Sequence, residues 1–371
     1  MCIKALTLEE LRHIKEFKYS ASNTSIAYNY VVSPLLNIVV KYLPKRLAPN
    51  VLTLLSLVFN IISFLFTVYE TGNDFTYELS RFACGVQTIA HFMYILLDNL
   101  DGKQARRTGT SSSYGMLLDH GCDVFTNIIV CYNVSHLLML GNTTFFSYCV
   151  FIALIPGFFT TTYEEYVLGY LNLPCINGAD EGNVFVFMGS LLGWLFTPSI
   201  YATKVACFTV GEWLALLVFV GTVFTIGTTL ANIAMKKGVS RMLMSLIDWI
   251  CFYNCILFPV LMCHLNYNEF YSEHLSLIML TIALLAARQT IDLQIKICSK
   301  QTIEYGIIVM AVNVLLPVCY FIENNTMKLT IIGLSVIALT TEIATLVVVR
   351  SIEILNHLDR KLLFIDVNDS K

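Results

Sequence analysis

The stretch DNLDGKQARRTGTSSSYGMLLDHGCD, which runs from Asp98 to Asp123, carries two pairs of carboxylates at helical spacing. Asp98 and Asp101 are three residues apart, and Asp119 and Asp123 are four apart, so each pair projects from one face of a helix. Oxygen ligands without a cluster of His or Cys favour Mg²⁺ or Mn²⁺ over Zn²⁺. The stretch therefore predicts a site for a divalent cation.

The residues between the two pairs are suited to a phosphate ligand. Gly102 follows the first pair and Gly115 precedes the second. Because glycine has no Cβ, the backbone or a ligand can come close at both positions. Arg106 offers a planar guanidinium group, which matches the geometry of phosphate oxygens. The stretch therefore also indicates a nucleotide-phosphate site.

The composition predicts an all-α polytopic membrane protein. Of the 371 residues, 56% are hydrophobic and 13% are charged, which excludes a set of soluble domains. The first residues, MCIKALTLEELRHIKEFKY, are amphipathic and of mixed charge, so we expect no cleaved signal peptide. The twelve cysteines include no CxxC pair and no zinc spacing. They are typical of small buried side chains, not of a disulfide framework.

The hydrophobic pattern predicts about ten transmembrane helices after an N-terminal interfacial segment. Residues 8–19 form an amphipathic helix expected on the membrane surface. Residues 28–42 are more apolar but contain Pro34, so we expect an interfacial or partly embedded helix. A spanning helix needs roughly 20 apolar residues. The predicted spans are 51–70, 83–100, 117–140, 146–163, 184–203, 209–233, 243–263, 275–297, 303–322 and 329–350.

The charges of the loops predict that both termini lie in the cytosol. The loops after even-numbered spans hold most of the Lys and Arg residues, which favours the cytosolic side. Asn142 and Asn324 begin glycosylation sequons that then fall on the lumenal side. The acidic stretch lies at the cytosolic ends of spans two and three. Ionised groups at a membrane boundary are unfavourable unless they are solvated or bind cations, and a bound metal ion explains four of them together.

The spacing of the acidic stretch resembles the signature of a known enzyme family. The eight positions DxxDG, AR, G, D and D match the CDP-alcohol phosphotransferase family without a departure: Asp98, Asp101, Gly102, Ala105, Arg106, Gly115, Asp119 and Asp123. Other stretches resemble the eukaryotic choline/ethanolamine phosphotransferase branch: FKYSASNTS (17–25), LAPNVLT (47–53), YEEY (163–166) and LPCINGADEG (173–182). Tyr163 stands where this branch leads us to expect Trp. The resemblance covers the first half of the chain.

The resemblance implies a ten-helix homodimeric enzyme of the endoplasmic reticulum or a related endomembrane, with its active site facing the cytosol. Such an enzyme transfers phosphocholine or phosphoethanolamine from CDP-choline or CDP-ethanolamine to diacylglycerol and releases CMP. It requires one or two Mg²⁺ or Mn²⁺ ions and works among membrane lipids. We expect no nucleic-acid partner.

The resemblance and the spacing together suggest roles for individual residues. The expected metal ligands are Asp98, Asp101, Asp119 and Asp123. The expected nucleotide-binding residues are Asn50, Thr53, Gly102, Ala105, Arg106 and Gly115. His120 lies three residues before Asp123 and is the candidate base, with Asp123 as the alternative. The departure at Tyr163 leaves Glu164 and Glu165 as alternatives for the matching glutamate of YEEY. Glu164 is taken, and it is expected to orient His120 or to contact the substrate.

The chain divides into four expected regions. Residues 1–50 form the interfacial segment, and residues 51–233 form the catalytic helices. Residues 234–350 form further transmembrane helices on the lipid-acceptor side with dimer contacts. Residues 351–371 form a cytosolic tail.

Several alternatives remain open at this point. A CDP-diacylglycerol-dependent phosphatidyltransferase acting on inositol or glycerol phosphate would share the motif, and a cation-coupled transporter would also bury acids. Arg106 and Arg107 could face lipid headgroups, and His91 is expected to be a core histidine or a hydrogen-bond partner. Four charged residues lie inside predicted spans, and for each of them a structural ion pair and a functional role are equally expected: Asp248, Arg288, Asp292 and Glu342.

Overall fold

The structure is a computed structural model, and it describes residues 4–72, 74–75, 77–141, 145–250, 252, 270, 273–319, 321–359 and 362. The described chain is mostly helical. Its α-helices are α1 (Leu8–Glu16), α2 (Ser33–Tyr42), α3 (Pro49–Thr71), α4 (Arg81–Thr108), α5 (Ser113–Leu137), α6 (Phe145–Leu168), α7 (Glu181–Phe196), α8 (Val210–Lys237), α11 (Leu275–Ser299), α12 (Ile307–Cys319) and α13 (Asn325–Leu358). A π-helical turn (Tyr28–Val32) precedes α2, and a 3₁₀ turn (Pro198–Ala202) follows α7.

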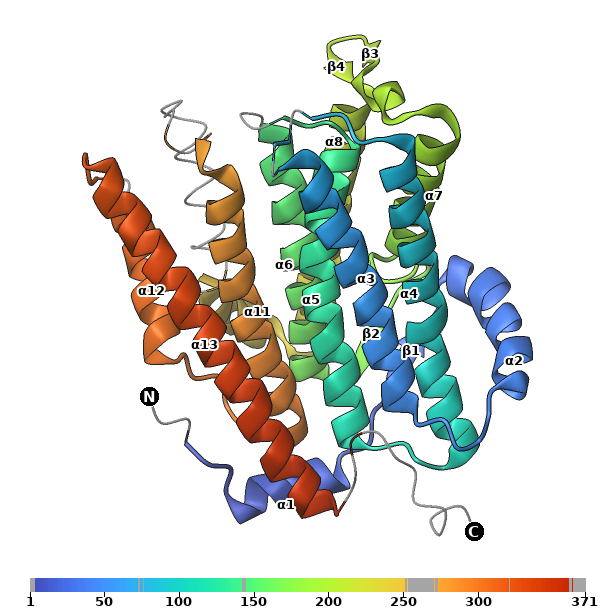
Figure 1. The fold of residues 1–371 in the computed structure, drawn as a ribbon. Helices are drawn as coiled ribbons and strands as arrows, with labels where there is room; N and C mark the ends of the chain where they lie inside the picture. Colours follow the sequence, from blue (N-terminus) through green and yellow to red (C-terminus); the bar gives the residue numbers. More distant parts are fainter. Residues whose placement is uncertain are drawn as a thin grey trace.

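The long helices stand side by side in one bundle, with α3, α4, α5, α6 and α8 on one side and α11 and α13 on the other (Figure 1). Four of the described helices are long and apolar enough to cross a membrane: α3, α8, α11 and α13. Many large apolar side chains on α3, α8 and α13 are exposed, as expected for surfaces that face lipid. The structure is therefore mostly helical, as predicted, with four short strands that the sequence did not predict, and it is consistent with a membrane protein. The prediction of ten spans remains a prediction, and the span expected at 243–263 lies mostly outside the described residues.

The hairpin of α4 and α5 has clear start and stop signals. Gly109 follows α4 with φ 70°, a left-handed conformation that glycine adopts without strain and that ends the helix. Ser112 caps α5 by accepting a hydrogen bond from the backbone N–H of Gly115 at 3.0 Å. The short turn between these two residues brings the two halves of the acidic stretch side by side.

The two N-terminal helices lie at the edge of the bundle. Thr7 and Glu10 form a capping box on α1, which packs against α11 and α13 at one end of the bundle (Figure 1). Helix α2 contacts α4, where the Arg107 guanidinium donates to the carbonyls of Val40 and Leu43 at 2.6 and 2.7 Å. Arg107 therefore satisfies free carbonyls at the C-terminus of α2.

A short parallel sheet joins the N-terminal segment to the end of α6. Strand β1 (Ala21–Asn23) pairs with β2 (Leu171–Leu173), with Ser22 opposite Asn172. A second small hairpin, β3 (Lys204–Val205) with β4 (Phe208–Thr209), precedes α8. The β1–β2 pairing fixes the chain just after α1 beside the C-terminus of α6.

Candidate functional site

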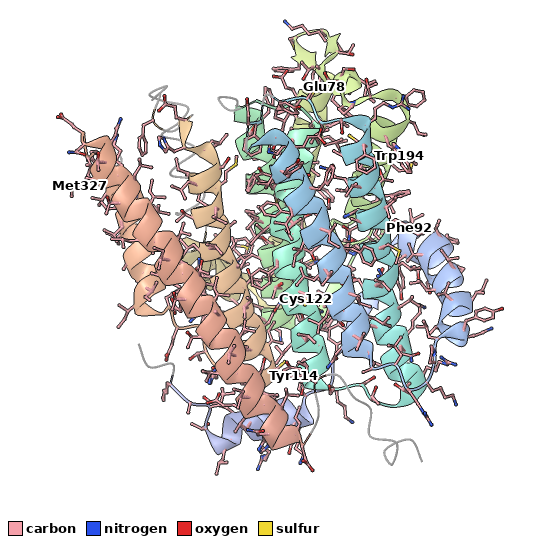
Figure 2. The ribbon with its side chains drawn as sticks, in the orientation of Figure 1. Glu78, Phe92, Tyr114, Cys122, Trp194 and Met327 are labelled. Atoms are coloured by element: carbon pink, nitrogen blue, oxygen red, sulfur yellow. The ribbon has the colours of Figure 1, made fainter. Side chains whose placement is uncertain are left out.

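Three carboxylates meet where α4 and α5 lie side by side. Asp98 from α4 and Asp119 and Asp123 from α5 each offer one oxygen, and these oxygens all lie within 4.8 Å of one another. Cys122, next to Asp123, lies in the half of the bundle nearer to α1, whereas Glu78 lies at the opposite end (Figure 2). Three of the four carboxylates that the spacing singled out thus form one compact cluster, and Asp101 lies outside this group.

The hydrogen bonds around the cluster hold the acidic side chains in place. The Thr53 hydroxyl of α3 donates to Asp101, which is buried and lies within interaction range of Asp119. The Tyr94 hydroxyl of α4 donates to Asp123 at 2.9 Å. Three helices therefore contribute to the geometry of one acidic centre.

The cluster fits a divalent cation. Oδ1 of Asp119 is buried, and within the described part of the chain it has no hydrogen-bond partner. In those same residues, no Lys or Arg forms an ion pair with Asp98, Asp119 or Asp123. Like charges held close together without counter-charges are unfavourable, and carboxylate oxygens are the ligands that Mg²⁺ and Mn²⁺ prefer. Asp98, Asp119 and Asp123 could hold such an ion, with Asp101 beside them.

Both glycines of the motif lie where the chain is crowded by polar groups. A Cβ on Gly102 would lie 3.4 Å from Nη1 of Arg106, so the exposed Arg106 side chain folds back over this glycine. A Cβ on Gly115 would lie 3.6 Å from Oδ1 of Asn50. The carbonyl of Ala105 accepts a hydrogen bond from the Thr110 N–H at 3.0 Å in the turn after α4. Asn50, Gly115 and the acidic cluster therefore share one end of the bundle.

The amide of Asn50 contacts the C-terminal segment. Its Nδ2 donates to the carbonyl of Leu362 at 2.7 Å. Leu362 also packs beside an apolar cluster that includes Ile14 of α1 and Tyr114 of α5. The C-terminal segment therefore reaches the end of the bundle where the acidic cluster lies.

His120 lies between the acidic cluster and the N-terminal segment. Its ring meets the ring of Tyr19 edge to face, with 5.6 Å between ring centroids and an interplanar angle of 78°. Its backbone carbonyl accepts a hydrogen bond from Gln294 of α11 at 3.3 Å. We find no hydrogen bond between His120 and Asp123 among the described side chains, although they lie three residues apart on α5.

The two neighbouring glutamates of YEEY have different surroundings. The Glu164 carboxylate accepts hydrogen bonds from Thr229 at 2.7 Å and Asn232 at 3.0 Å, both on α8, and from Asn172 at 3.2 Å. Glu164 therefore joins α6 to α8 and β2. Glu165 is 3% exposed, and in the described part of the chain its carboxylate has neither a hydrogen-bond partner nor an ion-pair partner.

Two stretches singled out in the sequence bind each other. Asn23 donates to Asp180 at 3.0 Å, and Ser25 donates to Glu181 at 2.8 Å. Glu181 also accepts a hydrogen bond from the Asn177 N–H at 3.0 Å. These contacts connect FKYSASNTS to LPCINGADEG, and they fix the backbone that carries Tyr19.

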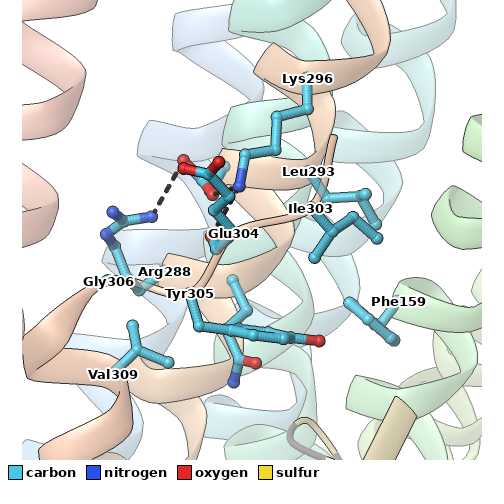
Figure 3. A pocket seen from close by; sticks show the side chains of 11 residues that line it. Phe159, Arg288, Leu293, Lys296, Ile303, Glu304, Tyr305, Gly306 and Val309 are labelled. Carbon is cyan, nitrogen blue, oxygen red and sulfur yellow. Dashed lines mark hydrogen bonds and ion pairs between the residues drawn. The ribbon is translucent and has the colours of Figure 1, made fainter. Parts of the chain in front are cut away.

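A second group of ionisable side chains lies apart from the acidic cluster, on α11 and α13. Arg288 lies 3.4 Å from Asp292 and 3.1 Å from Glu342, and Lys296 lies 2.7 Å from Asp292. Figure 3 shows Arg288 and Lys296 beside the loop that carries Glu304, whose carbonyl accepts a hydrogen bond from Lys296. We call these four charged side chains the α11–α13 ion-pair network.

Two further polar residues noted in the sequence, Asp248 and His91, also have partners within the protein. Asp248 lies 3.6 Å from Arg241 and accepts a hydrogen bond from the Tyr163 hydroxyl. His91 is buried, with Nε2 at 3.2 Å from the carbonyl of Asn183, which confirms its prediction as a core histidine with a hydrogen-bond partner.

Sequence reasoning missed two side chains near the site. Tyr94 could have been found, because it lies four residues before Asp98 and so shares its helix face. Tyr19 carried a weaker signal, since it lies in a stretch that resembles the enzyme family. Glu165 was the alternative to Glu164 in the sequence, and only the packing of α6 shows how the surroundings of the two glutamates differ.

The fold and the acidic cluster together define an integral membrane protein with a partly exposed carboxylate site that fits a cation. The model of the CDP-alcohol phosphatidyltransferase family matches residues 46–286, which include the whole acidic stretch. This chain belongs to that family.

Three relatives illustrate the similarity. An uncharacterized CDP-alcohol phosphatidyltransferase class-I family protein 3 of Dictyostelium discoideum is 31% identical over 56% of this chain and 54% of its own length. Choline/ethanolaminephosphotransferase 2 of Arabidopsis thaliana is 34% identical over 47% and 44%. Cholinephosphotransferase 1 of Homo sapiens is 30% identical over 64% and 58%. The chain thus spans about half the length of the curated relatives it matches.

Proposed function

We propose that the protein transfers phosphocholine, phosphoethanolamine or both from the CDP-alcohol to diacylglycerol, forming phosphatidylcholine or phosphatidylethanolamine and CMP. The observation that carries this proposal is the cluster of three carboxylates, whose oxygens lie within 4.8 Å of one another and which come from the eight-position motif. The names of the Arabidopsis and human relatives support the choice of amino alcohol.

In this proposal Asp98, Asp101, Asp119 and Asp123 hold one or two Mg²⁺ or Mn²⁺ ions. When bound, such ions would supply positive charge that offsets the charge developing on the leaving group. Arg106, exposed beside Gly102, donates to the diphosphate. In this proposal the nucleotide enters beside Asn50 and Gly115, which lie close together. When the cytidine part binds, the Asn50 amide gives up its hydrogen bond to the Leu362 carbonyl and forms a hydrogen bond with the ligand.

The reaction needs a group that accepts a proton. The 3-hydroxyl oxygen of diacylglycerol bonds to the phosphorus that carries the amino alcohol, the bond from that phosphorus to the CMP oxygen breaks, and CMP leaves with the electron pair. We assign the hydroxyl proton to His120, because Asp123 belongs to the carboxylate triad and already accepts a hydrogen bond from Tyr94. Glu164, assigned from the sequence to orient His120 or to contact substrate, is proposed instead to hold α6 against α8.

The wider setting is part of the same proposal. We place the protein in the endoplasmic reticulum or a related endomembrane, as a homodimer with ten spans and its active site towards the cytosol. Residues 51–233 would form the catalytic part, and residues 234–350 would face the lipid acceptor and the second subunit. The basic loops after even-numbered spans support this orientation.

The decisive experiment uses the purified full chain with radiolabelled CDP-choline or CDP-ethanolamine, diacylglycerol and Mg²⁺ or Mn²⁺. We expect CMP and the matching phospholipid to form together. A parallel reaction with CDP-diacylglycerol and inositol should form no product. If product formed only in the parallel reaction, the protein would be a CDP-diacylglycerol-dependent enzyme. If no donor gave CMP, the proposal would be refuted.

A further inference from the structure

Tyr19 is held beside the acidic cluster by contacts distant in sequence. It lies two residues before β1, which pairs with β2. Its ring contacts His120. Tyr19 is 45% exposed as a whole residue. Loss of solvation around its hydroxyl is the main cause that raises its pKa, the charges of Glu165, Asp119 and Asp123 raise that pKa further, and the charge of Arg106 lowers it. Tyr19 therefore lies within electrostatic range of both the triad and Glu165.

Glu165 is the acidic group near Tyr19 that lacks a partner. Its side chain is buried, and among the described residues nothing donates a hydrogen bond or a positive charge to its carboxylate. The neighbouring Glu164 has three donors at 2.7 to 3.2 Å. A buried carboxylate without a partner is strongly unfavourable, so a cation from outside the protein is the natural counterpart of Glu165.

The position of these two side chains relative to the triad suggests the cation. A CDP-alcohol whose phosphates lie at Asp98, Asp119 and Asp123 carries its alcohol only a few bonds from those phosphates. If the alcohol lay on the side of the triad occupied by Tyr19, it would meet the Tyr19 ring, which contacts His120, and the charge of Glu165, which acts on Tyr19. An ammonium group is attracted both to the face of an aromatic ring and to a carboxylate.

We propose that Tyr19 and Glu165 form the subsite for the ammonium group of the amino alcohol. This inference rests on the proposed function and adds the residues that recognise the headgroup. A quaternary ammonium has no N–H to donate, so it depends on the ring and on the charge of Glu165. A primary ammonium can also donate hydrogen bonds to Glu165. Tyr19 therefore contributes more to binding choline, and Glu165 contributes more to binding ethanolamine.

The test measures binding of CDP-choline, CDP-ethanolamine and CDP-glycerol to the purified full chain with Mg²⁺ and without diacylglycerol. CDP-glycerol has the same diphosphate but a neutral alcohol. Wild-type protein should bind CDP-choline more tightly than CDP-glycerol. Tyr19→Leu should weaken CDP-choline binding by roughly 5- to 30-fold, the range of a partly desolvated cation–π contact, and should leave CDP-glycerol binding unchanged.

Matched variants separate recognition from folding. Tyr19→Phe keeps the ring and should keep the preference for CDP-choline. Tyr30→Leu removes a tyrosine that is 80% exposed, and it should change the binding affinity for neither CDP-choline nor CDP-glycerol. Glu165→Gln should weaken both amino-alcohol ligands by about tenfold, with CDP-ethanolamine affected more, because it removes a charge-assisted contact.

The outcomes distinguish the subsite from the function. If Tyr19→Leu and Glu165→Gln weaken CDP-glycerol and CDP-choline equally, both residues are structural and the subsite is wrong. Equal affinity of wild-type protein for the charged and neutral ligands also refutes the subsite, while CMP formation still supports the transferase. If the wild-type chain binds no CDP-alcohol, both proposals fail.

Discussion

The acidic cluster of α4 and α5 and the ion-pair network of α11 and α13 solve the same physical problem in different ways. Both place several ionisable side chains inside a membrane bundle, where unpaired charge is unfavourable. The network contains two cations and two anions, and each lies within 3.4 Å of an opposite charge. The acidic cluster contains carboxylates alone. Each charge of the network therefore has a counter-charge beside it, although both Glu342 oxygens accept no hydrogen bond within the described residues. The carboxylates of the cluster have no Lys or Arg counter-charge among those residues, so the cluster fits a cation from solution.

The largest expected effect follows from removing one carboxylate of the cluster. Asp119→Asn should lower CMP formation by at least about 10³-fold, since charge stabilisation by a metal ion contributes several kcal/mol to such reactions. The same change removes one of several repelling charges, so the thermal midpoint without metal should not fall. Activity assays and thermal unfolding of the same sample check both parts. Full activity in Asp119→Asn would show that the cluster is no more functional than the network.

Removing His120 tests the neutral group beside the cluster. His120→Ala should lower turnover by about 10²- to 10³-fold, within the range of general base catalysis, and should leave the affinity for CDP-choline unchanged. Single-turnover rates and equilibrium binding check these two expectations. A loss of affinity without a loss of rate would assign His120 to binding instead of proton transfer.

Breaking the network should affect stability instead of chemistry. Glu342→Gln leaves the buried Arg288 without its closest counter-charge, and the Glu342 side chain is only 1% exposed. Removing one partner of a buried pair costs about 3–5 kcal/mol. Unfolding of the full chain in detergent measures the effect, and the metal requirement of the remaining folded protein should not change.

The matched control for the network is an ion pair on the surface of α1. Arg12 and Glu16 lie 3.5 Å apart with most of both side chains exposed. Glu16→Gln should therefore change the free energy of unfolding by less than about 1 kcal/mol. Equal effects of Glu16→Gln and Glu342→Gln would refute the structural role of the network.

A smaller effect than that of Glu342→Gln is expected for stabilisation by the metal ion. A ligand that binds only the folded state at about 100 times its dissociation constant adds roughly 2.7 kcal/mol to its stability. Mg²⁺ or Mn²⁺ should raise the thermal midpoint of wild-type protein and of Glu342→Gln, and it should not raise that of Asp98→Asn. A chelator should reverse the shift. An equal metal-induced shift in Asp98→Asn would place the cation elsewhere.

Much of the helical frame was predictable because hydrophobic runs are local. The span predicted at 51–70 corresponds to α3 (Pro49–Thr71), and the one predicted at 275–297 corresponds to α11 (Leu275–Ser299). The region predicted at 184–203 contains a shorter helix, because α7 ends at Phe196 and Pro198 begins a 3₁₀ turn. Proline lacks the N–H that would continue the helix, which explains the difference.

The side-chain partners were less predictable where they depend on contacts between distant segments. Glu164 and Glu165 are neighbours in one stretch, but successive residues on a helix point about 100° apart. Only the packing of α6 against α8 shows that Glu164 meets Thr229 while Glu165 does not. The sequence favoured neither a structural nor a functional role for Arg288 and Glu342. Their distance of 3.1 Å between α11 and α13 shows that they form an ion pair.

By itself the sequence determined the membrane class and the acidic motif, because hydropathy and helical spacing act within a few turns of one helix. Asp98, Asp101, Asp119 and Asp123 were identified from spacing alone. Only the tertiary structure decided which groups surround that motif. Tyr19 reaches His120 because β1 pairs with β2 about 150 residues later in the chain. Such contacts depend on how whole helices and strands pack, and no local pattern of residues records that packing.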